Sequence, residues 1–127
     1  MKLKQTIKTE KAPKAIGPYS QGIIFENLIF TSGQIGINAE GELVGKDIVE
    51  QTEQVIKNLK EVLKAGGSGL SSVIKTTVFL KNMSDFSAMN EVYEKYFTEK
   101  PARSTVEVSA LPKGALVEID CIAEIER

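Results

Sequence analysis

The side chains that this sequence lacks limit the chemistry that it can perform. Its 127 residues include no histidine and a single cysteine, Cys121. Ser–His and Cys–His nucleophile pairs and the usual zinc sites are therefore excluded, because they depend on histidine or on several cysteines. Any catalysis must use carboxylates, tyrosine, lysine, arginine, hydroxyls or backbone groups, and we expect neither a metal nor a cofactor.

Arg103 is the first residue with a type and place suited to ligand binding. It follows Pro101 in the stretch KPARSTVEV and begins a segment of alternating residues. The guanidinium of arginine offers two parallel donors that match a small planar carboxylate. From the residue alone, the commoner situation is a solvated arginine or one paired with a nearby carboxylate such as Glu107.

Glu118 is the second candidate, in the segment VEID near the end of the chain. A carboxylate is the only common acid/base side chain that this sequence offers near neutral pH. Asp120 and Glu124 fall on the same face if the segment is a strand, because side chains alternate with a period of two. These two acids compete with Glu118 for the role, and on the pattern alone each acid is more often solvated.

Four further residues stand where they could line a site. Tyr19 follows a Gly-Pro pair in a loop, where a tyrosine more often packs than reacts. Ser32 and Gly33 resemble a nucleophile motif, but the sequence has no base to activate the serine. We interpret Ser32 as a hydrogen-bonding group of a pocket and Gly33 as a point of close backbone approach. Asn90 lies in a helical segment and is equally well explained as a solvated surface residue.

Two helices are expected to position these residues. Asp47 and Glu50 have the spacing of a capping box, apolar residues then recur at helical intervals, and Gly66-Gly67 ends the segment. Ser84 or Asp85 can cap the second helix, in which apolar and aromatic residues again recur every three to four positions.

Five segments have the composition and alternation of strands, and turn residues bound them. They are residues 3–8, a hairpin over 22–33 that turns at Glu26-Asn27, and the stretches 71–81, 103–110 and 115–126. The resulting order is β-β-β-α-β-α-β-β. It predicts a single α+β domain over residues 1–127, with a mixed sheet and both helices on one of its faces.

Alternation within the last strand separates an apolar face from a face of mixed polarity. The apolar face is best placed under the helices and consists of Ala115, Val117, Ile119, Cys121, Ala123 and Ile125. We expect the other face to carry Glu118 together with Arg103, Thr105, hydroxyls and apolar residues such as Phe79. A face that is neither apolar nor fully charged suits a subunit interface with water-accessible pockets.

The overall composition gives expectations about partners and compartment. The formal net charge of −1 provides no clustered positive charge for nucleic acid, so a nucleic-acid partner is not expected. There is no apolar run of the length that a signal peptide or a membrane span needs, so no membrane partner is expected. A single cysteine fits a reducing cytoplasm.

Several segments together resemble the reactive-intermediate deaminase family, also called RidA or YjgF and formerly L-PSP endoribonuclease or translation inhibitor. They follow the family's order over nearly the whole chain and are AIGPYSQG (15–22), TSGQIG (31–36), VIKTTVFLKNMSDFSAMNEVYEKYF (73–97), PARSTVEV (101–108) and LPKGALVEIDCIA (111–123). The resemblance implies a chorismate-mutase-like fold and a homotrimer with active sites between subunits. It also implies hydrolysis of 2-iminobutanoate and 2-iminopropanoate to 2-oxo acids and ammonia.

The resemblance also implies roles for residues that match the family's motifs. Arg103 matches the arginine that binds the substrate carboxylate, and Glu118 matches the glutamate that positions the water. The catalytic set then also contains Tyr19, and the substrate-binding set is Ser32, Gly33, Asn90 and Thr105. Thr105 departs from the many members that carry cysteine there, which leaves the shape of the pocket and the preferred length of the substrate open.

Two other functions remain open on the sequence alone. The older family label implies an endoribonuclease or translation inhibitor, but RNA cleavage usually needs a strong acid/base pair and cations that neutralise phosphate. A non-enzymatic role as a chaperone-like or regulatory protein would leave no distinctive residue pattern.

Overall fold

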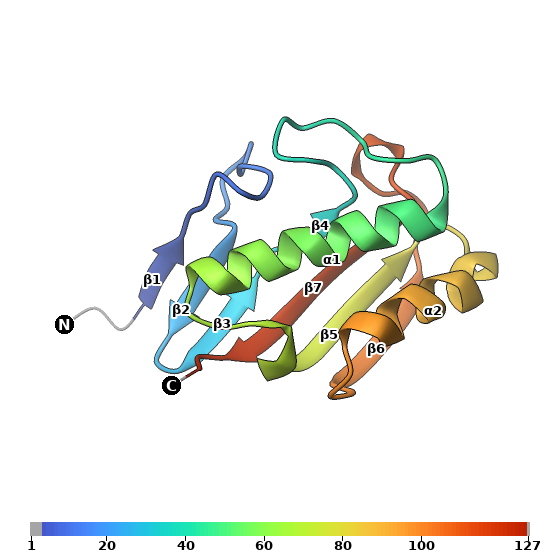
Figure 1. The fold of residues 1–127 in the computed structure, drawn as a ribbon. Coiled ribbons are helices and arrows are strands. Elements are labelled where there is room, and N and C mark those ends of the chain that lie inside the picture. Colours follow the sequence, from blue (N-terminus) through green and yellow to red (C-terminus); the bar gives the residue numbers. More distant parts are fainter. Residues whose placement is uncertain (1–3, 127) are drawn as a thin grey trace.

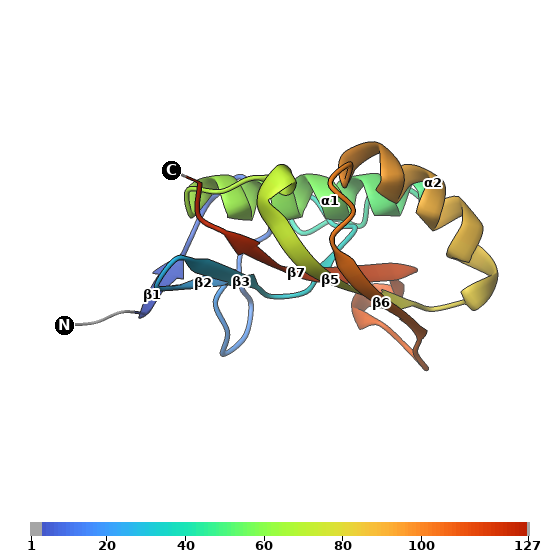
Figure 2. The same ribbon diagram turned by 90° about the horizontal axis from the view of Figure 1, so that it is seen from below.

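The computed structural model describes residues 4–126 and has one sheet with two helices on one of its faces (Figures 1 and 2). The strands follow the order β1-β2-β3-β7-β5-β6, and β4 also pairs with β7. The elements are β1 (Lys4–Ile7), β2 (Gly22–Phe25), β3 (Leu28–Thr31), β4 (Gln34–Ile35), α1 (Ile48–Ala65), β5 (Val73–Leu80), α2 (Phe86–Tyr96), β6 (Ala102–Glu107) and β7 (Val117–Glu124).

This architecture confirms the predicted α+β class, the mixed sheet and the placement of both helices. The short strand β4 is additional, and the last two strands are shorter than the stretches 103–110 and 115–126. The first predicted strand begins at residue 3, which lies outside the described residues. None of the helices within residues 4–126 is long and apolar enough to cross a membrane.

The predicted boundaries of α1 are confirmed by its hydrogen bonds. The side chain of Asp47 accepts a hydrogen bond of 2.9 Å from the backbone N–H of Glu50, which satisfies a donor that the first turn leaves free. At the other end, Gly67 adopts a φ of 89°, a conformation that favours glycine. The second helix begins differently, because a 3₁₀ turn over Met83–Asp85 leads into it and Asp85 makes no capping hydrogen bond.

The core lies between the sheet and the helices. The predicted apolar face of β7 is confirmed, since Val117, Ile119, Cys121 and Ala123 are all buried there. The helices and β5 complete this core with Val55, Ile56, Leu59, Val62, Leu63, Val78, Leu80, Met89 and Val92. Burying a side chain of this size contributes about 1.5–3 kcal/mol, so this layer holds both helices against the sheet.

The register of β6 overturns one prediction. β6 pairs in parallel with β5, and α2 supplies the crossover that a parallel pair requires. In this pairing Arg103 lies beside Thr76 and Thr105 beside Val78, and both partners on β5 point into the core. The prediction that Arg103 and Thr105 share the face of Glu118 was therefore wrong, because both lie on the side of the sheet that carries the helices.

Candidate active site

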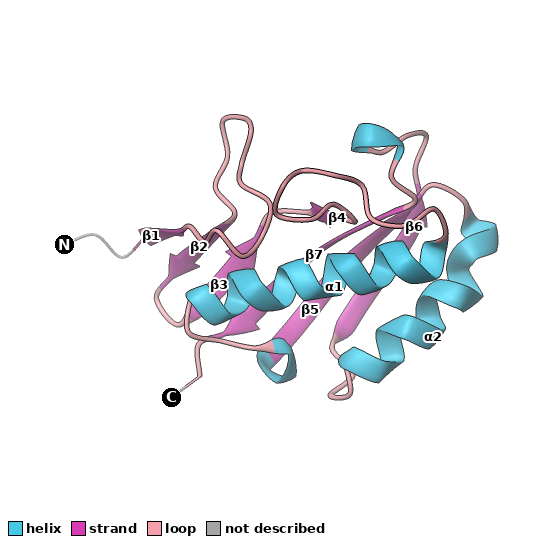
Figure 3. Ribbon diagram, turned by 45° about the horizontal axis from the view of Figure 1, so that its top comes forward, coloured by secondary structure: helices cyan, strands magenta, loops and turns pink. Residues whose placement is uncertain are grey.

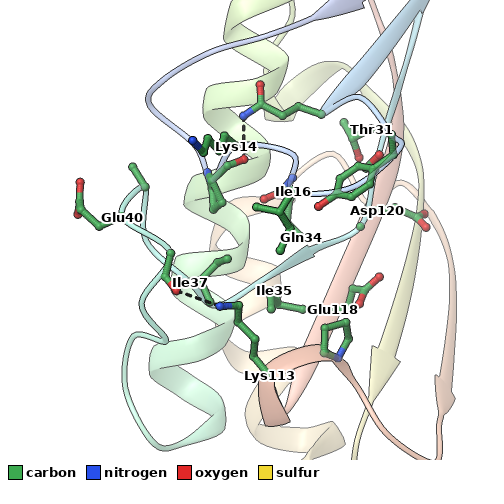
Figure 4. Close-up of a pocket in the computed structure, with 18 residues that line it drawn as sticks. Lys14, Ile16, Thr31, Gln34, Ile35, Ile37, Glu40, Lys113, Glu118 and Asp120 are labelled. Carbon is green, nitrogen blue, oxygen red and sulfur yellow. Dashed lines mark hydrogen bonds between the residues drawn. The ribbon is translucent and has the colours of Figure 1, made fainter.

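A cleft of about 510 Å³ lies beside β4 and the first half of β7. Figure 3 shows the loops that flank β4, and Figure 4 shows the residues that line the cleft, among them Glu118, Asp120 and Lys113. Four of the seven predicted site residues contribute to its wall, namely Tyr19, Ser32, Gly33 and Glu118. The cleft therefore unites residues from the first loop, the end of β3 and β7.

Glu118 enters the cleft from the open face of the sheet, between β4 and β5. Its neighbours across the strands are Ile35 and Phe79. A Cβ atom on Gly33 would overlap the carboxylate of Glu118 and come within 2.8 Å of its Cδ. Only glycine leaves room for the carboxylate here, which gives a physical cause for the close approach that the sequence suggested at Gly33.

Burial and a neighbouring acid change the protonation of Glu118. Burial raises the pKa of Glu118 above its ordinary value, and the nearby Asp120 raises that pKa further. Burial also raises the pKa of Asp120, whereas the hydroxyl of Thr77 and the charge of Lys75 lower it. Glu118 therefore takes up a proton more readily than an exposed glutamate, which suits a group that accepts and returns a proton during the reaction.

The first loop is fastened to the sheet by a buried glutamine that sequence reasoning missed. The side-chain oxygen of Gln21 accepts a hydrogen bond of 2.7 Å from the N–H of Thr9. Its amide group donates to the carbonyl oxygens of Thr9 and Pro13 at 3.0 and 2.8 Å. The hydroxyl of Ser32 donates to the carbonyl of Ser20 at 2.5 Å. These bonds hold the segment that presents Tyr19, which is 51% exposed, at the cleft.

Arg103 and Asn90 form a second group, between α2 and β6. The Nη1 group of Arg103 donates a hydrogen bond of 2.7 Å to the side-chain oxygen of Asn90. The Cζ atom of Arg103 lies 4.8 Å from the ring centre of Tyr93 and 5.5 Å from that of Phe86. Thr105 follows on the same face of β6, and its buried hydroxyl has no hydrogen-bond partner among the described residues.

Arg103 does not form the ion pair with Glu107 that the sequence alone made the commoner expectation. Glu107 instead accepts a hydrogen bond of 2.7 Å from the backbone N–H of Met83. Among residues 4–126 the hydrogen-bond partner of Arg103 is an amide, so no carboxylate neutralises the guanidinium there. Asn90 is likewise more than a solvated helix residue, since it orients Arg103.

Within one copy of the chain, the two groups lie on opposite sides of the sheet. Glu118 points away from the helices, whereas Arg103 packs under α2. β6 lies at one edge of the sheet, so Arg103 stands on an edge strand. Neither Arg103 nor Asn90 nor Thr105 lines the cleft that contains Glu118.

Phe86 and Tyr93 also belong to the surroundings of Arg103, and sequence reasoning treated them only as part of the apolar stripe of the second helix. The signal was available, because Phe86, Asn90 and Tyr93 follow one another at intervals of four and three residues. Residues at these intervals share one face of a helix. A stripe that alternates aromatic rings with an amide is suited to binding a cation.

Comparisons with known proteins bear on the family and the fold of this chain. A family model described as Endoribonuclease L-PSP matches residues 9–125. A RutC family protein of Pyrococcus abyssi is 57% identical over 122 residues, which cover 94% of this chain and 96% of that protein. A human protein named 2-iminobutanoate/2-iminopropanoate deaminase is 45% identical, over 95% of this chain and 90% of its own.

The similarity to known proteins extends to their three-dimensional structures. The crystal structure of the YjgF gene product of E. coli superimposes with a TM-score of 0.91 at 46% identity, and the match covers 96% of this chain and 99% of that one. The fold, the family model and the relatives agree over nearly the whole chain. The chain therefore belongs to the RidA/YjgF family, whose family model is described as Endoribonuclease L-PSP.

Proposed function

We propose that this protein hydrolyses 2-imino acids, such as 2-iminobutanoate and 2-iminopropanoate, to 2-oxo acids and ammonia. The observation that carries the proposal is the hydrogen bond that the guanidinium of Arg103 donates to the neutral amide of Asn90, which occupies one of its donors and leaves others for a ligand. An imino acid carries a planar carboxylate, and a guanidinium can bind both oxygens of a carboxylate through two parallel hydrogen bonds. Relatives named as deaminases at 45% and 47% identity support the same reaction.

The active site is composed of residues from two copies of the chain. Arg103 and Glu118 lie on opposite sides of one sheet, so a substrate that contacts both must lie between copies. In the homotrimer that we propose, one copy contributes Arg103, Asn90 and Thr105. Its neighbour contributes the cleft with Tyr19, Ser32, Gly33 and Glu118.

The open face of the sheet supports an assembly of this kind. It presents large apolar side chains that one copy leaves bare, since Phe30 is 40% exposed and Val106 is 43% exposed. Polar groups lie between them, among them the hydroxyl of Ser104, which accepts a hydrogen bond of 3.0 Å from Lys75. Exposed apolar side chains mixed with polar groups are typical of a surface that another subunit covers.

The reaction needs only orientation and one proton-transfer group. With the carboxylate held by Arg103, water attacks the imine carbon while Glu118 accepts a proton from that water. Glu118 then returns the proton to the nitrogen. The hydroxyl proton of the resulting adduct then passes through Glu118 to the nitrogen as the C=O bond forms and the C–N bond breaks, so that ammonia leaves and Glu118 is ionised again. Positioning and general acid/base assistance each lower such a barrier by several kcal/mol, and an imine carbon is already electrophilic.

The first test measures the role of Arg103. The imine is generated in situ from threonine with threonine dehydratase, and its disappearance is followed with wild type and with Arg103→Ala. We expect wild type to accelerate hydrolysis and the variant to lose at least ~10²-fold in kcat/KM, about 3 kcal/mol of transition-state binding. Arg103→Lys, which keeps the charge without the fork, should fall between them. Equal rates for wild type and Arg103→Ala would rule out the proposal.

The second test measures whether two copies share one site. Arg103→Ala and Glu118→Gln subunits, each of which we expect to lose most of its activity alone, are mixed after reversible dissociation. In a randomly mixed ring with sites between neighbours, about a quarter of the sites combine an intact Arg103 with an intact Glu118. We therefore expect activity to return to about that fraction. A site contained within one chain would give no recovery in any mixture.

RNA cleavage is the second candidate, because the matching family model carries the description Endoribonuclease L-PSP. The net charge of −1 and the absence of histidine give it little support in this chain. Incubation of highly purified protein with RNA tests whether it cleaves RNA. Cleavage that Glu118→Gln abolishes would favour this function, and cleavage that persists in the variant would indicate a contaminating nuclease.

A further inference from the structure

We propose that Phe86 and Tyr93 are positioning residues, which hold the guanidinium of Arg103 in the one orientation that receives the substrate carboxylate. The inference rests on the proposed function, since it assigns to Arg103 the binding of that carboxylate. Together with Asn90 these residues form what we call the α2 clamp: Phe86, Asn90 and Tyr93.

The α2 clamp is built into the geometry of the helix. Its three residues are spaced by four and three positions, so they lie on the side of α2 that faces β6. Two aromatic rings stand 4.8 and 5.5 Å from the Cζ atom of Arg103, within the range of cation–π attraction. The amide of Asn90 between them fixes the rotation of the guanidinium through one hydrogen bond.

The Tyr93 ring is itself held on a second side. Its hydroxyl forms a hydrogen bond of 2.7 Å with the hydroxyl of Thr76, which is fully buried and pairs with Arg103 in the sheet. Its ring also packs against the ring of Phe97 at a tilt of 32°, with 4.4 Å between the ring centres. The strand that carries Arg103 and the ring that contacts its side chain are therefore fastened to the same residue, Thr76.

Every group of the α2 clamp leaves the charge of Arg103 intact. Burial raises the pKa of Tyr93 by more than the hydrogen bond with Thr76 and the charge of Arg103 lower it. The phenol therefore stays neutral. Phe86 and Asn90 carry no charge. One N–H of the guanidinium serves Asn90, and arginine has five such donors. The α2 clamp thus fixes the guanidinium while leaving it donors for a carboxylate.

Holding a flexible side chain before the ligand arrives lowers the entropic cost of binding. A free arginine side chain has many rotamers, and its fork binds two oxygens only in the correct plane. The α2 clamp therefore acts on the affinity for the substrate carboxylate more than on the proton-transfer steps at Glu118. This difference separates a positioning role from a merely structural one.

The kinetic experiment uses the full-length assembled protein. We expect Phe86→Leu and Tyr93→Leu to raise KM for 2-iminobutanoate about tenfold with a smaller change in kcat, and to raise the inhibition constant of 2-oxobutanoate in parallel. Tyr93→Phe keeps the ring and should recover most of the affinity that Tyr93→Leu loses. Val92→Ala is the matched control, because it removes buried methyl groups from the same helix and should lower Tm without raising KM.

A direct readout of the guanidinium does not depend on the reaction. NMR signals of the Arg103 side chain, assigned by their loss in Arg103→Lys, should be shifted upfield by the two rings in wild type and should move towards free arginine in Phe86→Leu. Free-arginine shifts in wild type would overturn the inference, and so would unchanged KM in both leucine variants while Arg103→Ala remains impaired. If Arg103→Ala hydrolyses the imine as fast as wild type, the proposed function fails instead.

Discussion

The carboxylate of Glu118 lies directly against the backbone of Gly33, in the space that a side chain at position 33 would fill. Gly33 follows the end of β3, and Glu118 stands on β7, so a missing side chain in one segment creates the place for a carboxylate from another. This contact fixes where the carboxylate points and partly removes it from water. It links the geometry of the cleft to the raised pKa of Glu118.

Gly33→Ala tests this contact. The added methyl group displaces the carboxylate of Glu118, and a reacting group that moves by about 1 Å can cost ~10²-fold in rate. We expect kcat for 2-iminobutanoate to fall by about that factor while Tm changes little, because the carboxylate is the movable end of a flexible side chain. The measurement is steady-state kinetics together with thermal unfolding.

A second glycine serves as the control for that substitution. Gly69 also lacks a positive φ, and a Cβ atom there would meet only the end of Glu126, at 3.2 Å. Gly69→Ala should therefore keep the wild-type kcat. If Gly33→Ala also keeps it, the position of Glu118 does not limit the reaction.

The acid limb of the pH–rate profile should move when Asp120 loses its charge. Glu118 must be ionised to accept a proton, so activity falls as the pH falls through its pKa. Burial and Asp120 both raise that pKa, so the limb lies above the range of an exposed glutamate. Asp120→Asn removes one of the two causes, and we expect the limb of kcat/KM to shift to lower pH.

The position of the limb, and not the height of the profile, is the quantity to compare, since Asp120 also lines the cleft. Glu124→Gln is the control, because Glu124 is an exposed acid on the same strand that does not line the cleft. Its limb should coincide with that of wild type. A limb that stays in place in Asp120→Asn would mean that another group controls the rate.

The sequence was sufficient wherever the relevant signal is local. The hydrogen bond between Asp47 and Glu50 follows from a three-residue spacing, and the buried face of β7 follows from a period of two. Alternation in β6 separated Arg103 from Ser104 correctly, but alternation alone does not tell which set faces the helices. That choice depends on the register of β6 against β5. For this reason the division of the site residues between two faces could not be predicted.

Contacts between distant segments were also beyond the sequence. Gln21 is polar and nearly fully buried because it bonds to Thr9 and Pro13, and nothing in its own neighbourhood marks it as the residue that fastens the loop. Phe86 and Tyr93 have the spacing of core residues, and their role depends on an arginine that arrives from β6. A pattern within one segment cannot show which partner another segment brings to it.

Two buried threonine hydroxyls on neighbouring strands should respond in opposite ways to the same substitution. The hydroxyl of Thr76 is bonded to Tyr93 at 2.7 Å, whereas the hydroxyl of Thr105 is buried without a partner among residues 4–126. Valine replaces the hydroxyl by a methyl group of similar size. We expect Thr105→Val to raise the free energy of unfolding by about 1 kcal/mol and Thr76→Val to lower it by about 1–3 kcal/mol, because Thr76→Val leaves the buried phenol unpaired. Denaturant unfolding at fixed protein concentration measures both. A loss of stability in Thr105→Val would contradict the prediction, because removing an unpaired buried hydroxyl should not destabilise the fold.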